Sequence, residues 1–232
     1  MSKCLLFGGG GCHDYRSICP VLKEYLAGVD GLAVDYVAED FDALRAERLA
    51  PYDSIVLYYT GGELPLEAKR GLVEGVAAGK GFVGVHAATC CFEKSPEYLA
   101  MVGGVFRAHP FIRDYLVSLT PTAHPVTAGI AGYTVKDWEK WPVFEFPVKD
   151  EQYLIDGDSR NLLLATTVFR GVTWPVAWVK AWGKGKVFYL ALGHDLEACR
   201  NLFFRQMLVN GVRWASDPAA ELPGYDKTRF AI

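Results

Sequence analysis

Three histidines stand at or shortly after the ends of apolar segments that the sequence predicts to be β-strands. His13 follows a glycine run at the end of the first such segment. His86 follows Gly81–Val85, and His194 follows Lys186–Leu192. In open α/β sheets, ligands bind at the carboxyl ends of the strands, so these side chains stand where a site is expected. Neutral imidazoles bind divalent metals and also serve as acids and bases in catalysis, although each could instead be a buried core histidine.

Two further histidines lie outside the strand ends. His109 lies in a loop and is followed by Pro110. This loop can fold back over the sheet edge that carries His86. His124 also precedes a proline, and we expect the backbone of that turn to satisfy it. The predicted metal ligands are therefore four histidines: His13, His86, His109 and His194. Zinc is the first metal to consider, because imidazole is one of its preferred ligands.

Carboxylates accompany several of these histidines. Glu151, in the pair Asp150-Glu151 before a predicted strand, could be a metal ligand or a general base, and the alternative is ordinary surface charge. Asp14 and Asp195 each follow a histidine and precede a helix, so they could be helix N-caps or could orient the imidazoles. We assign catalysis to His86, Glu151 and His194, and substrate binding to His13, Asp14, His109 and Asp195.

The segment Gly81–Cys91 has the pattern of a strand that runs into a nucleophile elbow. A cysteine hydrolase would place its thiol on that turn, with a histidine such as His194 from a later strand. Cys90 and Cys91 come about one helical turn too late, so this mechanism is disfavoured. The six cysteines show no metal-binding spacing, and no secretory signal is recognisable, which favours free thiols in a reducing cytoplasm.

The first half of the chain alternates predicted strands with predicted helices, which favours a parallel sheet covered on both faces. The predicted strands are Lys3–Phe7, Leu32–Val37, Asp53–Tyr59 and Gly81–Val85, and the predicted helices are Tyr15–Ala27, Phe41–Leu49 and Leu66–Ala78. The glycine run 8–11 does not complete a dinucleotide-binding fingerprint, because His13 or Asp14 stands where its last glycine is needed. We expect no nucleotide cofactor.

The second half is mostly extended and predicts an antiparallel extension of the parallel core. Its predicted strands are Ile112–Thr120, Tyr133–Lys136, Gln152–Ile155, Asn161–Phe169 and Pro175–Trp182. The strand Lys186–Leu192 then returns to the core, and Leu196–Ala215 is predicted to be one closing helix. We expect a single α/β domain over residues 1–216 and an irregular tail over residues 217–232.

Composition narrows the function classes. A chain of 232 residues suits one large domain. The net charge of −3, without a long basic run, gives no reason to expect nucleic-acid binding. No apolar stretch reaches the length of a membrane span. The extension is rich in aromatic residues, and we expect most of them in the core. One or two could stack on a sugar. Apolar side chains left on the surface of the extension favour a homo-oligomer.

Several short motifs follow one another along the chain: Gly84–Ala88, Gly103–Phe106 with His109-Pro110, His124–Thr127, Asp150–Tyr153, Gly185–Tyr189 with Leu192–Asp195, and Asn210–Ala215. In this order and spacing they resemble the ThuA-like (trehalose utilisation) family, which has the class I glutamine amidotransferase-like fold. The resemblance covers nearly the whole chain up to the tail. It implies a flavodoxin-like αβα core whose elbow lacks the amidotransferase cysteine, in agreement with His86 at that position. The family's histidine and acidic motifs correspond to His13, His86, His109, His194 and Glu151.

The resemblance implies a role in carbohydrate utilisation, in which oxidised disaccharides are processed. We therefore expect a metal-assisted lyase, isomerase or hydrolase that acts on a sugar or keto-sugar, and not a glutamine amidotransferase. The alternative is a non-catalytic module that binds a carbohydrate or another protein in the same cleft. A third hypothesis is a residual amidohydrolase that uses Cys90 or Cys91.

Overall fold

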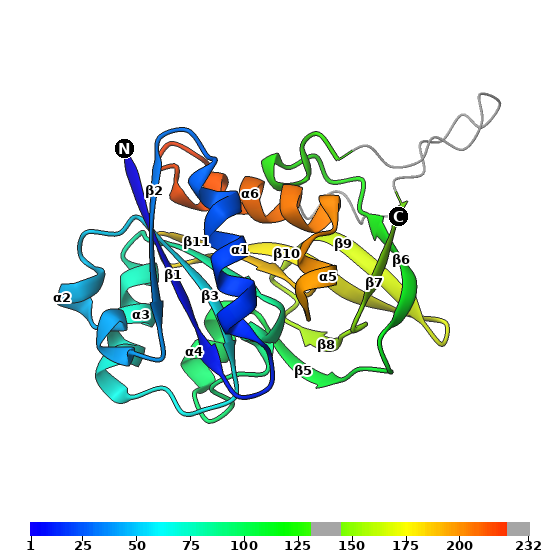
Figure 1. Cartoon of the computed structure of the whole chain (residues 1–232), viewed down its shortest axis with the longest axis horizontal. Coiled ribbons are helices and arrows are strands. Elements are labelled where there is room, and N and C mark those ends of the chain that lie inside the picture. Colours follow the sequence, from blue (N-terminus) through cyan, green and yellow to red (C-terminus); the bar gives the residue numbers. More distant parts are fainter. Residues whose placement is uncertain (131–144, 222–232) are drawn as a thin grey trace.

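The protein was analysed as a computed structural model, which describes residues 1–130 and 145–221. Five parallel strands form one half of its main sheet, and in spatial order they are β2 (Leu32–Ala38), β1 (Ser2–Gly10), β3 (Ser54–Thr60), β4 (Gly81–Val85) and β11 (Gly185–Leu190) (Figure 1). This is the order of a flavodoxin-like sheet, which reverses direction between β1 and β3. The predicted parallel core is confirmed.

Antiparallel strands continue the same sheet beyond β11. They are, in order, β10 (Val172–Trp182), β9 (Leu162–Phe169), β6 (Arg113–Leu119) and β7 (Glu145–Asp150). A separate antiparallel pair, β5 (Gly104–Ala108) with β8 (Leu154–Gly157), lies beside the carboxyl ends of the parallel strands (Figure 1). The predicted antiparallel extension is thus confirmed, and it is continuous with the core.

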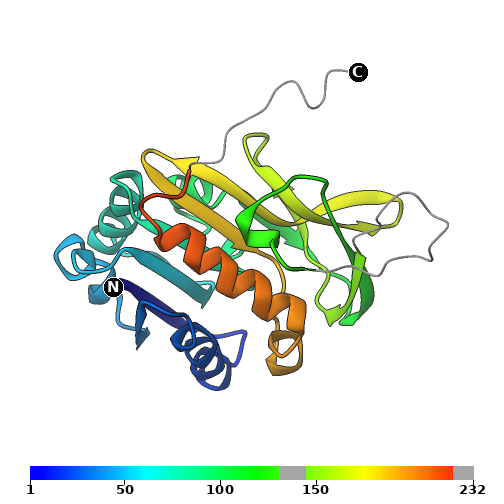
Figure 2. The same cartoon turned by 90° about the horizontal axis from the view of Figure 1, so that it is seen from above.

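Helices cover both faces of the sheet (Figure 2). On one face lie α1 (Tyr15–Ala27), α5 (Leu196–Cys199) and α6 (Leu202–Ser216), and on the other lie α2 (Ala46–Leu49), α3 (Leu66–Ala77) and α4 (Pro96–Val102). Short 3₁₀ turns complete the described elements, namely η1 (Phe41–Leu44), η2 (His86–Thr89) and η3 (Pro125–Thr127). In the sequence the parallel strands are nearly continuous apolar runs. The three-layer αβα arrangement explains this pattern, because helices bury both faces of these strands.

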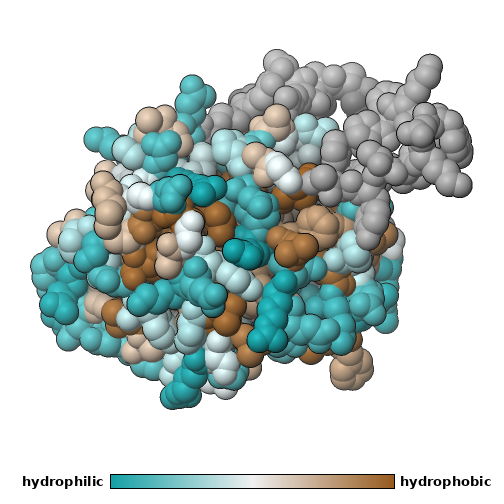
Figure 3. Space-filling model, turned by 45° about the horizontal axis from the view of Figure 1, so that its top comes forward, coloured by the Kyte–Doolittle hydropathy of each residue, from teal (hydrophilic) through white to brown (hydrophobic). Residues whose placement is uncertain are grey.

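The core is built mainly from the parallel strands. All seven residues of β3 are buried, and Trp178 stacks on Tyr189 with ring centroids 4.2 Å apart. Hydrophilic residues predominate on the face drawn in Figure 3, with some apolar side chains exposed between them. Exposed apolar residues of the antiparallel strands include Leu116, Val168 and Val172. No helix in the described part of the chain is both long and apolar enough to cross a membrane.

Several predicted boundaries were wrong. The closing helix is interrupted at Asn201, whose side chain accepts hydrogen bonds from the N–H groups of Phe203 and Phe204 and so begins α6 anew. The Phe41–Leu49 helix is divided into η1 and α2 by the extended residue Arg45. The apolar periodicity of both segments continues across the breaks, so it gave no sign of them.

The second half also differs in detail. The strand predicted at Gln152 begins only at Leu154, because residues 151–153 form a loop between β7 and β8. Strands β5 and β7 were not predicted. The predicted strand Tyr133–Lys136 lies outside the described residues, as does most of the predicted tail, of which residues 217–221 contain no helix or strand.

Replacing the Asn201 cap tests this account of α6. We expect Asn201→Ala to lower the free energy of unfolding by about 1 kcal/mol, because two backbone N–H groups lose their acceptor. Asn201→Asp keeps an acceptor at the same position and is expected to stay close to the wild type. Urea denaturation followed by circular dichroism measures both, and equal stability of Asn201→Ala and the wild type would contradict the cap assignment.

Candidate functional site

The register of the parallel strands brings the predicted histidines to one edge of the sheet. Gly10 pairs with Thr60, so the loop that carries His13 lies beside the end of β3. Val85 pairs with Leu190, which places His86 beside the residue that follows β11. A side chain at Gly10 would lie 2.2 Å from the carbonyl oxygen of Thr60, and φ there is +89°, so glycine is needed for this approach.

Four side chains meet at this edge. One ligand atom from each of His13, His86, Glu151 and His194 lies within 4.8 Å of all the others. The two Nε2 atoms of His13 and His86 are 3.2 Å apart. Oε2 of Glu151 lies 3.4 Å from Nε2 of His86 and 3.1 Å from Nδ1 of His194. We refer to these four residues as the donor group.

Outer contacts orient two of the imidazoles. Nδ1 of His86 donates to the carbonyl oxygen of Ala191 at 2.7 Å, since a carbonyl can only accept. That hydrogen bond fixes the tautomer, so Nε2 of His86 carries a lone pair directed into the donor group. Nδ1 of His13 is 2.6 Å from Oγ1 of Thr60, which likewise leaves Nε2 of His13 to face the donor group.

His86 has the backbone of an elbow residue. Its φ is +48°, an uncommon value for a residue with a side chain, and it follows the last residue of β4 directly. The Tyr189 hydroxyl donates to the carbonyl oxygen of His86 at 2.6 Å and holds this turn in place. Backbone held in a sparsely populated conformation concentrates at functional sites. His86 therefore occupies the elbow, in line with the interpretation of Gly81–Cys91.

Glu151 and His194 are positioned by one buried carboxylate. Asp150, the last residue of β7, is 2 % exposed. Its oxygens accept hydrogen bonds from the backbone N–H groups of Gly193 at 2.7 Å, His194 at 3.1 Å and Glu151 at 2.8 Å. Asp150 thus ties the end of the antiparallel extension to the end of β11, and it sets the spacing between Glu151 and His194.

Burial and charge divide the protonation states of the donor group. Burial and, after it, the neighbouring His86 and His194 lower the pKa of His13 to about 3, so this imidazole is neutral at physiological pH. Contact with the Glu151 carboxylate raises the pKa of His194 despite partial burial. Burial alone would raise the pKa of Glu151, but His194 and His86 lower it well below its usual range. A negative charge therefore lies among the imidazoles.

The donor group fits a divalent cation. Nδ1 of His194 is buried and has no hydrogen-bond partner in the described residues, because its 3.1 Å approach to Glu151 lacks hydrogen-bond geometry. Buried polar atoms without a partner are uncommon and call for an explanation. Three imidazoles and one carboxylate are a familiar set of zinc ligands, and outer hydrogen bonds such as that from His86 to Ala191 accompany such ligands.

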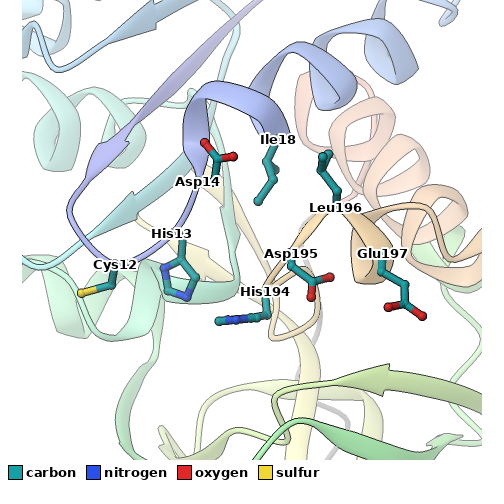
Figure 4. Close-up of a pocket in the computed structure, with 8 residues that line it drawn as sticks. All are labelled: Cys12, His13, Asp14, Ile18, His194, Asp195, Leu196 and Glu197. Carbon is teal, nitrogen blue, oxygen red and sulfur yellow. The ribbon is translucent and has the colours of Figure 1, made fainter.

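The remaining predicted residues lie around the donor group. His109 does not belong to it, although its Nδ1 is 3.5 Å from Oε1 of Glu151; the same nitrogen is 2.8 Å from the carbonyl oxygen of Pro110. Asp14 and Asp195 are the N-caps of α1 and α5. Figure 4 shows the Asp14 carboxylate directed away from the His13 imidazole. Both aspartates also line a cleft of about 410 Å³ that is bordered by His13 and His194.

Cys90, Cys91 and the fifth histidine do not take part in this chemistry. Burial raises the pKa of Cys90 to about 11, which keeps its thiol protonated, and Cys91 is fully buried. His124 is the N-cap of η3 and accepts a hydrogen bond from the N–H of Val126. This agrees with the prediction that backbone groups of its turn satisfy this side chain.

Three supporting residues of the site were not predicted from the sequence. Thr60 ends β3, so the rule that marked the histidines could also have marked it. Asp150 stands in the acidic pair that was noted only for its charge. Tyr189 could not have been found, since its role depends on a contact with a backbone carbonyl across the sheet.

Residues 3–215 match the family model ThuA, described as trehalose utilisation. The chain belongs to this family. The fold of the ThuA chain agrees with that of a ThuA-like protein from Parabacteroides merdae, with a TM-score of 0.78 and 22 % identity over 96 % of this chain and 92 % of that one. The agreement supports the fold alone, since so low an identity carries no activity.

Other structures share the fold at lower similarity. A cytoplasmic protein from Salmonella typhimurium LT2 has a TM-score of 0.65 and 16 % identity, over 93 % of this chain and 100 % of that one. A β-galactosidase from Bacillus circulans sp. alkalophilus matches at a TM-score of 0.58 and 13 % identity, over 93 % of this chain but only 30 % of the enzyme. None of the curated proteins matches the chain.

Asp150→Asn tests the positioning role of that carboxylate. We expect a loss of about 2–3 kcal/mol in the free energy of unfolding, because an amide oxygen cannot replace both carboxylate oxygens and its NH₂ group would face backbone donors. The exposed Asp114 on β6 offers a matched control, and Asp114→Asn is expected to change stability little. Chemical denaturation compares the two, and equal effects would show that the buried carboxylate is not needed.

Proposed function

We propose that this ThuA-family protein is a metal-dependent enzyme that acts on a sugar or keto-sugar. The observation that carries the proposal is the convergence of His13, His86, Glu151 and His194, whose ligand atoms lie within 4.8 Å of one another. Zinc is the metal we favour, because imidazole nitrogen and carboxylate oxygen are among its usual ligands. The proposed ligand set therefore replaces the predicted His109 with Glu151.

A divalent metal at this site would polarise a carbonyl oxygen and acidify the C–H bond next to it. That chemistry suits elimination, hydration or isomerisation of a keto-sugar, so a lyase or an isomerase is proposed, and a hydrolase if the metal would instead activate a water molecule. Within the chain, Oε2 of Glu151 faces the imidazoles while Oε1 faces His109 at 3.5 Å. Oε1 is therefore the atom of the donor group best placed to take a proton from a substrate on the His109 side.

The family's link to trehalose utilisation supports a sugar as substrate. Asp14 and Asp195 border the cleft beside His13 and His194, where they could accept hydrogen bonds from sugar hydroxyls. We further propose a cytoplasmic location, as for the Salmonella protein of the same fold. Exposed apolar residues of the antiparallel strands, such as Leu116 and Val168, support self-association.

Metal analysis tests the proposal directly. Protein purified without a polyhistidine tag should retain about one equivalent of metal per chain, and His86→Ala and His194→Ala should lose most of it. His124→Ala, which removes a histidine outside the donor group, should retain the metal. Elemental analysis by mass spectrometry provides the measurement.

Turnover of oxidised and unoxidised disaccharides is measured on the same samples. Product formation that is lost in His86→Ala and His194→Ala supports an enzyme. Ligand binding without product would instead favour the non-catalytic module. The proposal would be contradicted if the wild type contained no metal and the His86→Ala and His194→Ala variants kept full activity.

The apparent affinity for zinc should rise with pH. Binding requires a neutral His194, and contact with Glu151 raises its pKa above the ordinary 6.5, so protons compete with the metal at and below that raised pKa. His13 should contribute little to this dependence near neutrality, because its pKa is lowered to about 3. Competition with a chromophoric chelator across the pH range measures the affinity, and an affinity that does not change with pH would contradict this assignment.

A further inference from the structure

A cluster of three rings adjoins the donor group on the side of β5. Phe106 and Tyr153 have ring centroids 4.5 Å apart, and His109 lies 5.8 Å from Phe106 and 6.0 Å from Tyr153. Tyr153 also packs on the imidazole of His86, with centroids 4.2 Å apart and an angle of 33° between the planes. We name Phe106, His109 and Tyr153 the aromatic wall, and it is in contact with a proposed metal ligand.

The three rings of the wall differ in exposure. Tyr153 is only 3 % exposed, so it belongs to the core and backs the other two rings. Phe106 is half-buried and His109 is exposed, so both residues keep surface accessible to solvent. Core packing explains Tyr153, but it does not require an accessible phenyl ring next to a polar site. An accessible apolar surface beside polar groups that converge is typical of small-molecule sites.

We infer that Phe106, supported by His109, is the surface on which the apolar C–H face of the sugar ring stacks. The inference rests on the proposed function, and it assigns a specificity role to residues outside the donor group. A sugar ring carries hydroxyls on its rim and C–H groups on its faces. Aromatic rings offer a flat apolar surface with negative charge above the ring plane, which suits such C–H groups.

The position of the wall relates stacking to the reacting group. His109 contacts both groups: its Nδ1 is 3.5 Å from Oε1 of Glu151, and its ring centroid is 5.8 Å from that of Phe106. A sugar ring seated on Phe106 would therefore lie close to the Glu151 carboxylate. Stacking would select cyclic sugars over open-chain polyols that carry the same hydroxyls.

The same loop supplies a matched control. Phe111 is 95 % exposed and, in the described part of the chain, makes no ring contact of the kind that joins the wall. Replacing Phe111 tests whether an exposed phenyl ring anywhere near the site is enough. At Phe106 itself, Leu keeps apolar volume without a ring, and Trp keeps a ring.

The experiment measures binding of trehalose to the zinc-loaded full chain by calorimetry, with sorbitol as the ligand that lacks a ring. We expect trehalose to bind more tightly than sorbitol to the wild type. Phe106→Leu should weaken trehalose binding about tenfold, whereas Phe106→Trp and Phe111→Leu should stay within about threefold of the wild type. Zinc content and the unfolding midpoint are measured on every variant.

The outcomes separate the two proposals. Wild-type affinity in folded, zinc-containing Phe106→Leu would overturn stacking and leave the sugar site intact. Equal losses of affinity in Phe106→Leu and Phe106→Trp, with loss of zinc, would show that Phe106 only packs against its neighbours. That result would also overturn the stacking inference. Failure of the zinc-containing wild type to bind trehalose would overturn the stacking inference, whereas the proposed function is decided separately by metal content and by turnover of oxidised and unoxidised disaccharides.

Discussion

The parallel alignment of β1, β3, β4 and β11 is the constraint on which the site depends. Parallel strands in register end at one edge, so the residues that follow them are brought together without any attraction between their own side chains. This matters because three imidazoles and a carboxylate do not associate spontaneously; burial disfavours their charged forms. The hydrophobic sheet supplies the free energy that holds them together, and the side chains need only the correct rotamers. The pairing of Val85 with Leu190 shows this directly, since it presents the carbonyl oxygen of Ala191 to His86.

A second level of organisation joins the two halves of the sheet. The antiparallel extension contributes Glu151, which no parallel strand could supply at that point. Its placement depends on Asp150, whose carboxylate accepts backbone N–H groups from the loop after β11. A buried carboxylate is costly to desolvate, and it is tolerated here because hydrogen bonds satisfy it. The extension is therefore part of the site and not an appendage to it.

The strand-end rule is the reason why much of the site could be predicted from the sequence. His13, His86 and His194 were marked because apolar runs of the length of a strand precede them, and such runs are local features. The fourth member of the donor group could not be identified in this way. Whether His109 or Glu151 joins the three histidines depends on β5 and on the loop before β8. The positions of β5 and of that loop are set by pairing with distant strands, which the hydrophobic periodicity of the sequence does not indicate. The break at Asn201 was missed for a related reason, because a cap depends on a single side chain within an apolar pattern that continues past it.

The donor group draws its members from both ends of the chain, and this has a consequence for biosynthesis. His13 leaves the ribosome early, while His194 emerges only when most of the chain has been made. A nascent chain can build β1 to β4 and bury much of their apolar surface, yet at that stage it holds only His13 and His86 of the donor group. Contacts between residues so distant in sequence form late and slowly in folding. The complete donor group is thus a property of the finished chain, and the metal site that we propose can form only in the last steps of folding.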